Sequence, residues 1–394
     1  MSAMAETPLG LERLQQRALV VGLAALAACV VAAVIGLASW PDFFRGWLIG
    51  WLYCLGIALG SLAILMLHYL SGGAWGLVVR RILESATRTL PLLALLFVPL
   101  FTIGVGDVYL WARPGVTEGD PVLRHSSVYL NVPFFRLRAV IYLAAWLGCA
   151  YVFNKWSRER DARPDPYPRR FRLLAGPGLV LYGLTITFAS IDWAMSLEPH
   201  WYSTIYPLGF ATGQVLSGFA FGIAAAVALR RREPFARLVT PGNLNDLGNL
   251  TLAFVMLWAY MEFSQLLLTW SGNIHAEVPW YLRREHGAWT AVAVALIALH
   301  FALPFLLLLS RRVKRDPRLI GAVALALLFM RGADLVWTLV PGFQRAGFAL
   351  HWLDLVAPVG IGGLWLWAFL AQLRDRPLVP LNDPEVEEAL AHAH

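Results

Sequence analysis

Charge is what this sequence has little of. Asp, Glu, Lys and Arg make up 14% of its 394 residues, and 58% of the residues are hydrophobic. Soluble domains carry about 25% charged residues, so this composition excludes an ordinary soluble domain and predicts a membrane protein that contacts the lipid bilayer over much of its surface. The net charge of +7 does not indicate nucleic-acid binding, because the basic residues lie in short segments between apolar runs.

Cysteine is equally scarce. Cys29, Cys54 and Cys149 each stand alone inside an apolar run, with no CxxC or CxxCH pattern. The chain therefore lacks the ligand sets of an iron-sulfur cluster or a c-type haem, and we predict that it holds no metal. His68 and His300 could in principle ligate a b-type haem, but a packed or proton-relaying role suits these histidines better.

Ten apolar runs have about the 20 residues that a helix needs to cross a bilayer. This pattern predicts an all-α membrane protein with about ten transmembrane helices. The runs lie near 18–38, 47–70, 90–111, 139–155, 174–195, 207–229, 247–270, 287–309, 319–340 and 351–372. Segment 74–88 is amphipathic and basic, and we expect it to lie on the membrane surface.

The basic residues alternate between the two sides of this arrangement. Twenty-three of the 32 Lys and Arg residues fall in one set of loops and termini, and eight fall in the opposite set. The positive-inside rule therefore places both termini, 1–17 and 373–394, in the cytoplasm. The run 18–38 is longer than the apolar core of a signal peptide, so we expect a retained helix.

Acids occur late in each of the four central helices that run outward: Asp107, Asp192, Glu262 and Asp334. Carboxyl groups inside a membrane are usually paired or functional. Arg331 and Asp334 are three residues apart, which fits an ion pair as well as a chemical role. Glu262 has no cation within a helical turn and is the better candidate for a group that takes and releases protons.

The stretch SIDWAMSLEPHWYSTIYP (190–207) brings Asp192, Glu198 and His200 within nine residues at the outer end of a helix. No Lys or Arg lies between positions 172 and 230. We therefore expect acids without cationic partners, able with Asp107 to accept protons. The alternative is that Glu198 shapes the turn and His200 contacts a partner protein. The polar loop 271–286 is another candidate partner surface.

That stretch and LWAYMEFSQLLLTWSGNIHAEVPWYLRREHGAW (257–289) resemble a known family. The chain is similar over nearly its whole length to the second quinone-type (ActF-like) membrane subunit of bacterial alternative complex III, in the polysulfide-reductase (NrfD) superfamily. The resemblance implies two four-helix bundles, 47–195 and 207–340, with peripheral helices 18–38 and 351–372. It also implies the bacterial inner membrane as the location.

The family resemblance further implies a complex that oxidises menaquinol and passes electrons to iron-sulfur and c-type haem subunits, beside a paralogous NrfD-like membrane subunit. The chain would then be a subunit of an enzyme and not catalytic alone, with quinone as its possible cofactor. In one interpretation, a quinol site near the outer face uses proton acceptors Asp107, Asp192, Glu198 and His200. In the other, the chain conducts protons or supports assembly, through Glu262, His300, Arg331, Asp334 and His68. A secondary transporter is a third, less favoured interpretation, because paired broken helices are lacking.

Overall fold

The computed structural model describes residues 10–163, 167, 169–233, 235–343, 347–348, 350–380 and 382. Within these ranges the structure is helical and contains no strand. Ten segments are long and apolar enough to cross a bilayer, which confirms the predicted all-α membrane protein. The predicted terminal segments lie outside the description over 1–9 and 383–394.

The long helices are α1 (Glu12–Val34), α2 (Trp40–Ser71), α3 (Ala74–Thr87), α4 (Leu90–Thr102), α8 (Val132–Ala162), α9 (Arg169–Trp193), α10 (Tyr206–Leu229), α12 (Pro241–Gly272), α14 (Ala288–Ala295), η4 (Leu296–Ala302), α15 (Leu303–Leu309), α17 (Pro317–Leu339) and α18 (Leu353–Arg374). Short helices connect them: α5 (Val105–Val108), η2 (Leu110–Ala112), α6 (Val116–Gly119), α7 (Pro121–Ser126), η3 (Met195–Leu197), α11 (Phe235–Leu238), α13 (Val278–Leu282), α16 (Arg311–Arg315) and η5 (Val340–Phe343).

Polar caps followed by proline begin several of the long helices. Ser39 accepts a hydrogen bond from the backbone N–H of the third residue beyond it, as do Asn131 and Thr240, and Asp316 caps α17 in a similar way. A proline follows each cap in the first turn, where its missing N–H costs nothing. These helix starts are therefore fixed by local sequence.

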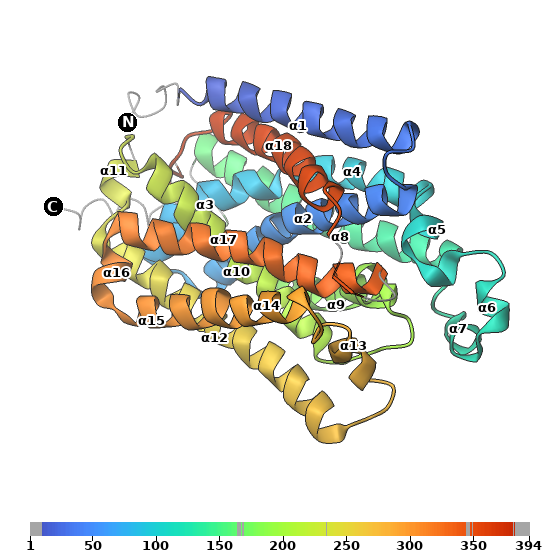
Figure 1. The fold of residues 1–394 in the computed structure, drawn as a ribbon. Helices are drawn as coiled ribbons and strands as arrows, with labels where there is room; N and C mark the ends of the chain where they lie inside the picture. The colour runs from blue at the N-terminus through green and yellow to red at the C-terminus, as the bar shows by residue number, and fades with distance from the viewer. Residues whose placement is uncertain are drawn as a thin grey trace.

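The spanning helices form two rings of four. In the first ring, α2 packs on α4 and α9, and α8 packs on the same two helices. In the second ring, α10 packs on α12 and α17, and the α14–η4–α15 segment packs on the same two. Helices α2 and α10 join the rings, while α18 covers α2 and α1 covers α18 (Figure 1).

Small residues bring the joining helices together. A Cβ atom at Gly60 of α2 would clash with the backbone of Gln214 on α10, and Gly218 of α10 meets the backbone of Gly60 in return. Nearer the start of α2, Gly46 and Gly50 approach the backbone of α18 equally closely. Such small residues at four-residue spacing allow membrane helices to pack backbone against backbone.

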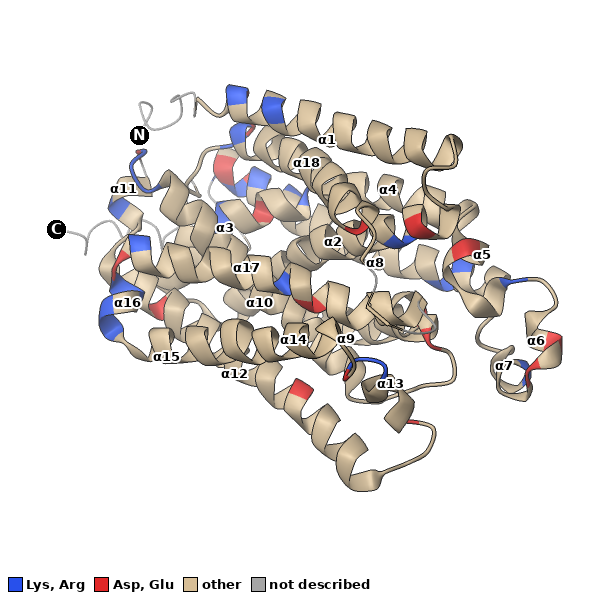
Figure 2. Ribbon diagram, in the orientation of Figure 1, with Lys and Arg blue, Asp and Glu red and all other residues tan. Residues whose placement is uncertain are grey.

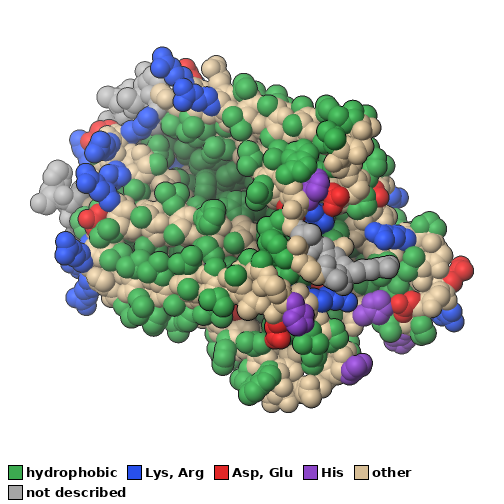
Figure 3. Space-filling model, in the orientation of Figure 1, with side chains coloured by type: hydrophobic (Ala, Val, Ile, Leu, Met, Phe, Trp, Pro, Cys, Tyr) green, Lys and Arg blue, Asp and Glu red, His purple; other side chains and the backbone are tan. Residues whose placement is uncertain are grey.

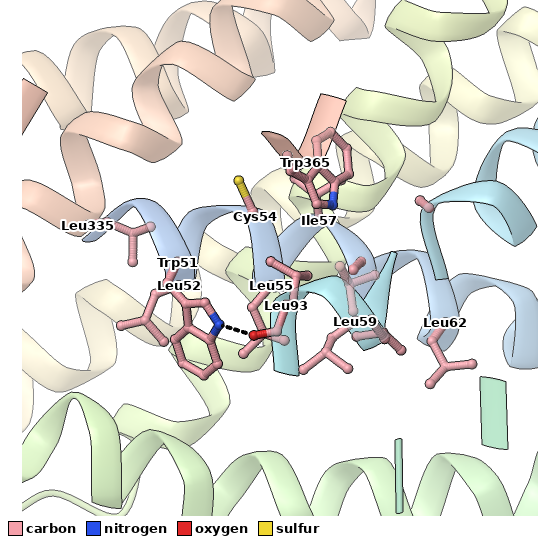
Figure 4. Packing of buried hydrophobic residues seen from close by; sticks show 14 of the residues in the cluster. Trp51, Leu52, Cys54, Leu55, Ile57, Leu59, Leu62, Leu93, Leu335 and Trp365 are labelled. Atoms are coloured by element: carbon pink, nitrogen blue, oxygen red, sulfur yellow. Dashed lines mark hydrogen bonds between the residues drawn. The ribbon is translucent and has the colours of Figure 1, made fainter. Parts of the chain in front are cut away.

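The first ring has an aromatic core. Trp51 of α2 is fully buried, and its indole N–H donates to the Leu93 carbonyl of α4 at 2.8 Å (Figure 4). Its ring stacks on Phe97 with centroids 4.4 Å apart and meets Trp193 edge-on at 5.0 Å. Trp146 meets Trp193 from the other side. Large rings that are locked by contact and hydrogen bonding leave little room for water in this interior.

Segment 74–88 does not lie on a surface as predicted. Residues 76–87 of α3 are buried against α2, α10 and α18. The carboxylate of Glu84 accepts hydrogen bonds from Arg80 at 3.2 Å, Arg81 at 2.7 Å and Ser157 at 2.9 Å. The amphipathic pattern is real, but its basic residues are neutralised inside the protein by an acid one turn away.

The third spanning segment also differs from its prediction. It covers residues 74–102 instead of 90–111, because the chain bends after Thr102. Asp107 therefore lies beyond this candidate span, in the short helix α5, instead of late within it as predicted. The Tyr109 hydroxyl, two residues on, donates to the Trp193 carbonyl at 3.1 Å and ties this bend to the end of α9.

Charged residues gather at the two ends of the molecule. Lys and Arg are most frequent around the start of α1, around α11 and α16, and at the end of α18 (Figure 2). The flank between the ends is largely hydrophobic (Figure 3). Because the number of spans is even, α1 begins and α18 ends at the same, arginine-rich end. Its assignment to the cytoplasm stays a prediction.

Candidate functional site

Asp192 lies in the last turn of α9 and is fully buried. Its carboxylate accepts hydrogen bonds from Arg138 Nε at 2.8 Å, Arg138 Nη2 at 2.7 Å and the Tyr142 hydroxyl at 2.8 Å. The guanidinium lies over the rings of both Tyr129 and Phe134. The expectation of an acid without a cationic partner is wrong here, because α8 supplies the partner from 54 positions earlier.

Glu198 follows α9 and is also paired, again contrary to expectation. It accepts hydrogen bonds from Arg283 Nη1 and Arg284 Nη2, both at 2.7 Å. Arg284 is buried, stacks on the Trp280 ring at 3.6 Å and donates to backbone carbonyls at the end of α17. Burial lowers the pKa of Arg284, and the Glu198 carboxylate opposes that effect. Loop 271–286 thus contributes two arginines to an internal ion-pair cluster and is not only a surface.

His200 and Asp107 are in two further places. The His200 Nε2 atom lies 2.6 Å from Asp120 Oδ2 at the exposed start of α7. This hydrogen bond lowers the pKa of Asp120. Asp107 has neither a side-chain hydrogen bond nor an ion pair with any described residue. The four predicted proton acceptors therefore do not form one cluster.

The second ring holds a different kind of carboxyl group. Glu262 of α12 lines a cavity of about 20 Å³ together with Arg331 and Asp334 of α17. This is enough space for one water molecule. Arg331 and Asp334 form an ion pair, which was one of the two interpretations that the sequence left open. Glu262 makes no ion pair and no side-chain hydrogen bond to any residue in the described ranges.

Two glycines of α10 make room for this cluster. A Cβ atom at Gly209 would lie 2.8 Å from Glu262 Oε1, and one at Gly213 would clash with the Arg331 guanidinium. The two positions are one helical turn apart, so they form a notch on one face of α10. Glu262 and Arg331 reach into the ring only because this notch lacks side chains.

A row of polar groups leads from Glu262 toward the loops. Tyr206, which also lines the cavity, interacts electrostatically with Glu262 on one side and with Arg284 and Glu198 on the other. Tyr281 of α13 is also close enough to Glu262 and Arg284 to be affected by their charges. Burial together with the Glu262 carboxyl raises the pKa of its hydroxyl. Arg283, which pairs with Glu198, is about half exposed, so this group of residues reaches the molecular surface.

Comparison with known proteins adds no family. No protein-family model matches this chain, and no curated protein matches it either. The site must therefore be interpreted from its own geometry.

His300 also lies in the second ring, near Arg331. It is fully buried, and neither ring nitrogen has a hydrogen-bond partner within the described part of the chain. Its ring meets Trp258 edge-on at 4.4 Å. The surrounding turn, η4, is a π-helix, and Pro304 cannot donate to the His300 carbonyl four residues before it. The widened turn places the His300 imidazole, without a hydrogen-bond partner among the described residues, near Arg331.

His68 lies away from this cluster, near the arginine-rich end of α2. It is buried and meets the Trp75 ring edge-on at 5.3 Å, and Gly76 packs directly on its imidazole. No group of three His, Cys, Asp or Glu residues that could hold a metal occurs in the searched ranges. His68 is thus packed against Trp75 and Gly76.

The residues that sequence reasoning missed are mainly the partners of the acids. They are Arg138, Arg283, Arg284, Tyr206 and Tyr281. One signal was available: cations are rare on the side of the acids, so each one there was a candidate partner. Spacing along one helix could not reveal these pairs, because each joins different helices or loops.

Proposed function

We propose that this integral membrane protein is a subunit of a quinol-oxidising respiratory complex, and that its second ring carries protons. The observation that supports the proton role is the Glu262 carboxyl, which shares a water-sized cavity with an ion pair and has no cation of its own. The resemblance of 190–207 and 257–289 to the ActF-like subunits supports the complex, with menaquinol as donor and iron-sulfur, c-type haem and NrfD-like subunits as partners.

Oxidation of a quinol releases two electrons and two protons. The electrons must leave to neighbouring subunits, because this chain lacks the cysteine patterns of electron carriers. A carboxyl group that can exist in both protonation states can pass protons onward, whereas one that is held by arginine stays ionised. Glu262 fits the first description.

The row of groups around Glu262 gives the proton a route. A water in the cavity would connect Glu262 to the Tyr206 hydroxyl, and Tyr281 continues the row toward Glu198 and Arg283. The His300 ring nitrogens can also accept or donate a proton. The Arg331–Asp334 pair, which shares the cavity with Glu262 and acts electrostatically on His300, would set the charge that a moving proton meets.

A quinol site at Asp107, Asp192, Glu198 and His200 stays a prediction with less support. Arg138 and Tyr142 occupy the Asp192 carboxylate, and Arg283 and Arg284 occupy Glu198. Neither carboxylate has a free oxygen pointing toward a ligand in this arrangement. These acids therefore suit a structural role at the outer mouth better than direct contact with quinol.

The test uses the purified complex in liposomes with a pH-sensitive dye. Glu262→Gln should slow proton movement coupled to quinol oxidation by about tenfold or more, since positioned acid–base groups contribute roughly 100-fold to 10,000-fold. Glu262→Asp should retain part of the activity. The complex should assemble normally, because Glu262 holds no partner in place.

Glu285→Gln is the matched control. Glu285 is an exposed acid in the loop after α13, and removing its charge should leave proton movement unchanged. Normal proton movement in an assembled Glu262→Gln complex would remove this residue from the mechanism. An equal loss in both variants would assign the effect to surface charge.

A further inference from the structure

A separate cavity lies at the arginine-rich end of the first ring. Its volume is about 310 Å³, within the range of roughly 300–1,000 Å³ that small-molecule sites occupy. It lies where the α3–α4 junction, the second half of α8 and the end of α18 meet. The lining residues are Thr87, Arg88, Pro91, Leu147, Ala150, Tyr151, Asn154, Lys155, Arg158, Gln372 and Arg376.

One face of α8 gives the cavity two chemically different halves. Leu147, Tyr151, Lys155 and Arg158 follow one another at helical spacing on this face, over about 16 Å. The first two are apolar or aromatic and the last two are basic. Tyr151 is 66% exposed toward the flank of the bundle. The cavity thus opens both to the lipid-facing side and to the charged end.

The charges of the cavity are unbalanced. Four of the lining residues are cations, and no carboxylate of a described residue lines it: the cations are Arg88, Lys155, Arg158 and Arg376. Two acids close to these cations are already engaged. Asp375 is exposed and pairs with Arg88 at 2.7 Å, and Glu84 is held by arginines of α3 and also pairs with Arg376 Nη1 at 3.7 Å.

Arg376 carries an unused donor at this place. Its side chain is 8% exposed, and its guanidinium donates to the Asn154 carbonyl at 3.1 Å. Its Nε atom is buried and has no hydrogen-bond partner among the residues that the structure describes. Burial, followed by repulsion from Arg88, lowers the pKa of Arg376 to about 10. A buried donor in a field of like charges is stabilised by an anionic acceptor.

We propose that this cavity binds an anionic phospholipid, with the phosphate among Arg88, Lys155 and Arg158 and an acyl chain along Tyr151 and Leu147. Basic pockets between membrane helices suit phosphate headgroups in this way. A free phosphate ion would use the same cations, but it would have no use for the apolar half. The lipid would join α8 to the end of α18 at the membrane boundary.

The test titrates the purified full-length chain in detergent with phosphatidylglycerol and counts bound lipid by native mass spectrometry. The variant Lys155→Gln/Arg158→Gln should bind about thirtyfold more weakly, because two interfacial cations are removed. Both residues are exposed and the fold does not depend on them. The control Arg311→Gln/Arg312→Gln removes two exposed cations at the same end of the molecule, in α16, and should bind like the wild type.

Two further measurements decide between the possible ligands. Phosphatidylcholine should bind much more weakly than phosphatidylglycerol, and excess inorganic phosphate should not displace the lipid. Equal binding of phosphatidylcholine would overturn the proposal, because the cations would then play no part. Displacement by inorganic phosphate would also overturn it, in favour of a free-phosphate site, as would unchanged binding by the Lys155→Gln/Arg158→Gln variant.

Discussion

The two rings of helices differ in how their buried ionisable groups are paired. In the first ring and the α3 helix that leads into it, the buried acids are held by arginine: Asp192 by Arg138 near one end and Glu84 by Arg80 and Arg81 near the other. Interlocked aromatic rings fill the space between these two pairs. In the second ring, beside the Arg331–Asp334 pair, the interior keeps a cavity, a carboxyl group without an ion pair and an imidazole without a hydrogen-bond partner among the residues that the structure describes.

This difference in ion pairing indicates which ring is built for stability and which can change its protonation state. A carboxylate with two hydrogen bonds from arginine stays ionised, and breaking such a pair is costly. A carboxyl group beside a small cavity can change its protonation state at a much lower cost. The first ring is therefore suited to hold the assembly together, and the second ring is suited to exchange protons. The predictions below test this contrast from the largest expected effect to the smallest.

The largest effect should come from breaking the buried pair of the first ring. Arg138→Met leaves Asp192 buried with only the Tyr142 hydroxyl, and we expect a loss of about 3–5 kcal/mol in the free energy of unfolding. Reversible unfolding in mixed micelles, followed by circular dichroism, measures it. Adding Asp192→Leu should restore much of the stability, because no unpaired charge then remains.

Arg136 provides the control for this prediction. It lies two residues away on α8 but donates only to the backbone carbonyls of Phe101 and Thr102. Arg136→Met should therefore cost much less than Arg138→Met. Equal losses in the two variants would mean that the Asp192 pair has no special weight in the first ring.

A smaller effect is expected where the rings meet. Gly60→Ala inserts a methyl group against the Gln214 backbone, so α2 and α10 must move apart. Overpacking of this kind typically costs about 1–3 kcal/mol. Gly148→Ala on α8 is the matched control, because nothing lies within 4 Å of a Cβ atom at that position. If the two variants have the same unfolding midpoint, close packing at Gly60 does not hold the rings together.

The smallest effect concerns the exposed Asp120–His200 contact outside both rings. The pKa of Asp120 is lowered, so its folded-state contribution is present above the ordinary pKa of aspartate and is lost as pH falls through the lowered value. Asp120 also accepts from the N–H groups of Val122 and Leu123. The protection of these two amides from hydrogen exchange, relative to their intrinsic exchange rate at each pH, should fall in acid and stay unchanged at neutral pH. Asp120→Asn should abolish the acid-dependent part, and an unchanged pH profile in this variant would contradict the assignment.

Local sequence was sufficient for the number of spans and for the starts of several helices. The length of an apolar run decides whether a helix can cross the bilayer, and caps such as Asn131 and Asp316 act on their own helix only. The Arg331–Asp334 pair was equally accessible, because both residues lie on one helix face. Glu262 was singled out from the sequence for the same local reason.

Tertiary structure decided which charges are paired. The sequence around Asp192 and Glu198 contains no cation, yet both are held by arginines that lie 54 or more positions away. It also decided that α3 is buried instead of exposed, since its amphipathic pattern fits either environment. Membrane insertion depends on the hydrophobicity of one segment at a time, whereas the partner of a charge depends on which helices become neighbours, and only packing determines that.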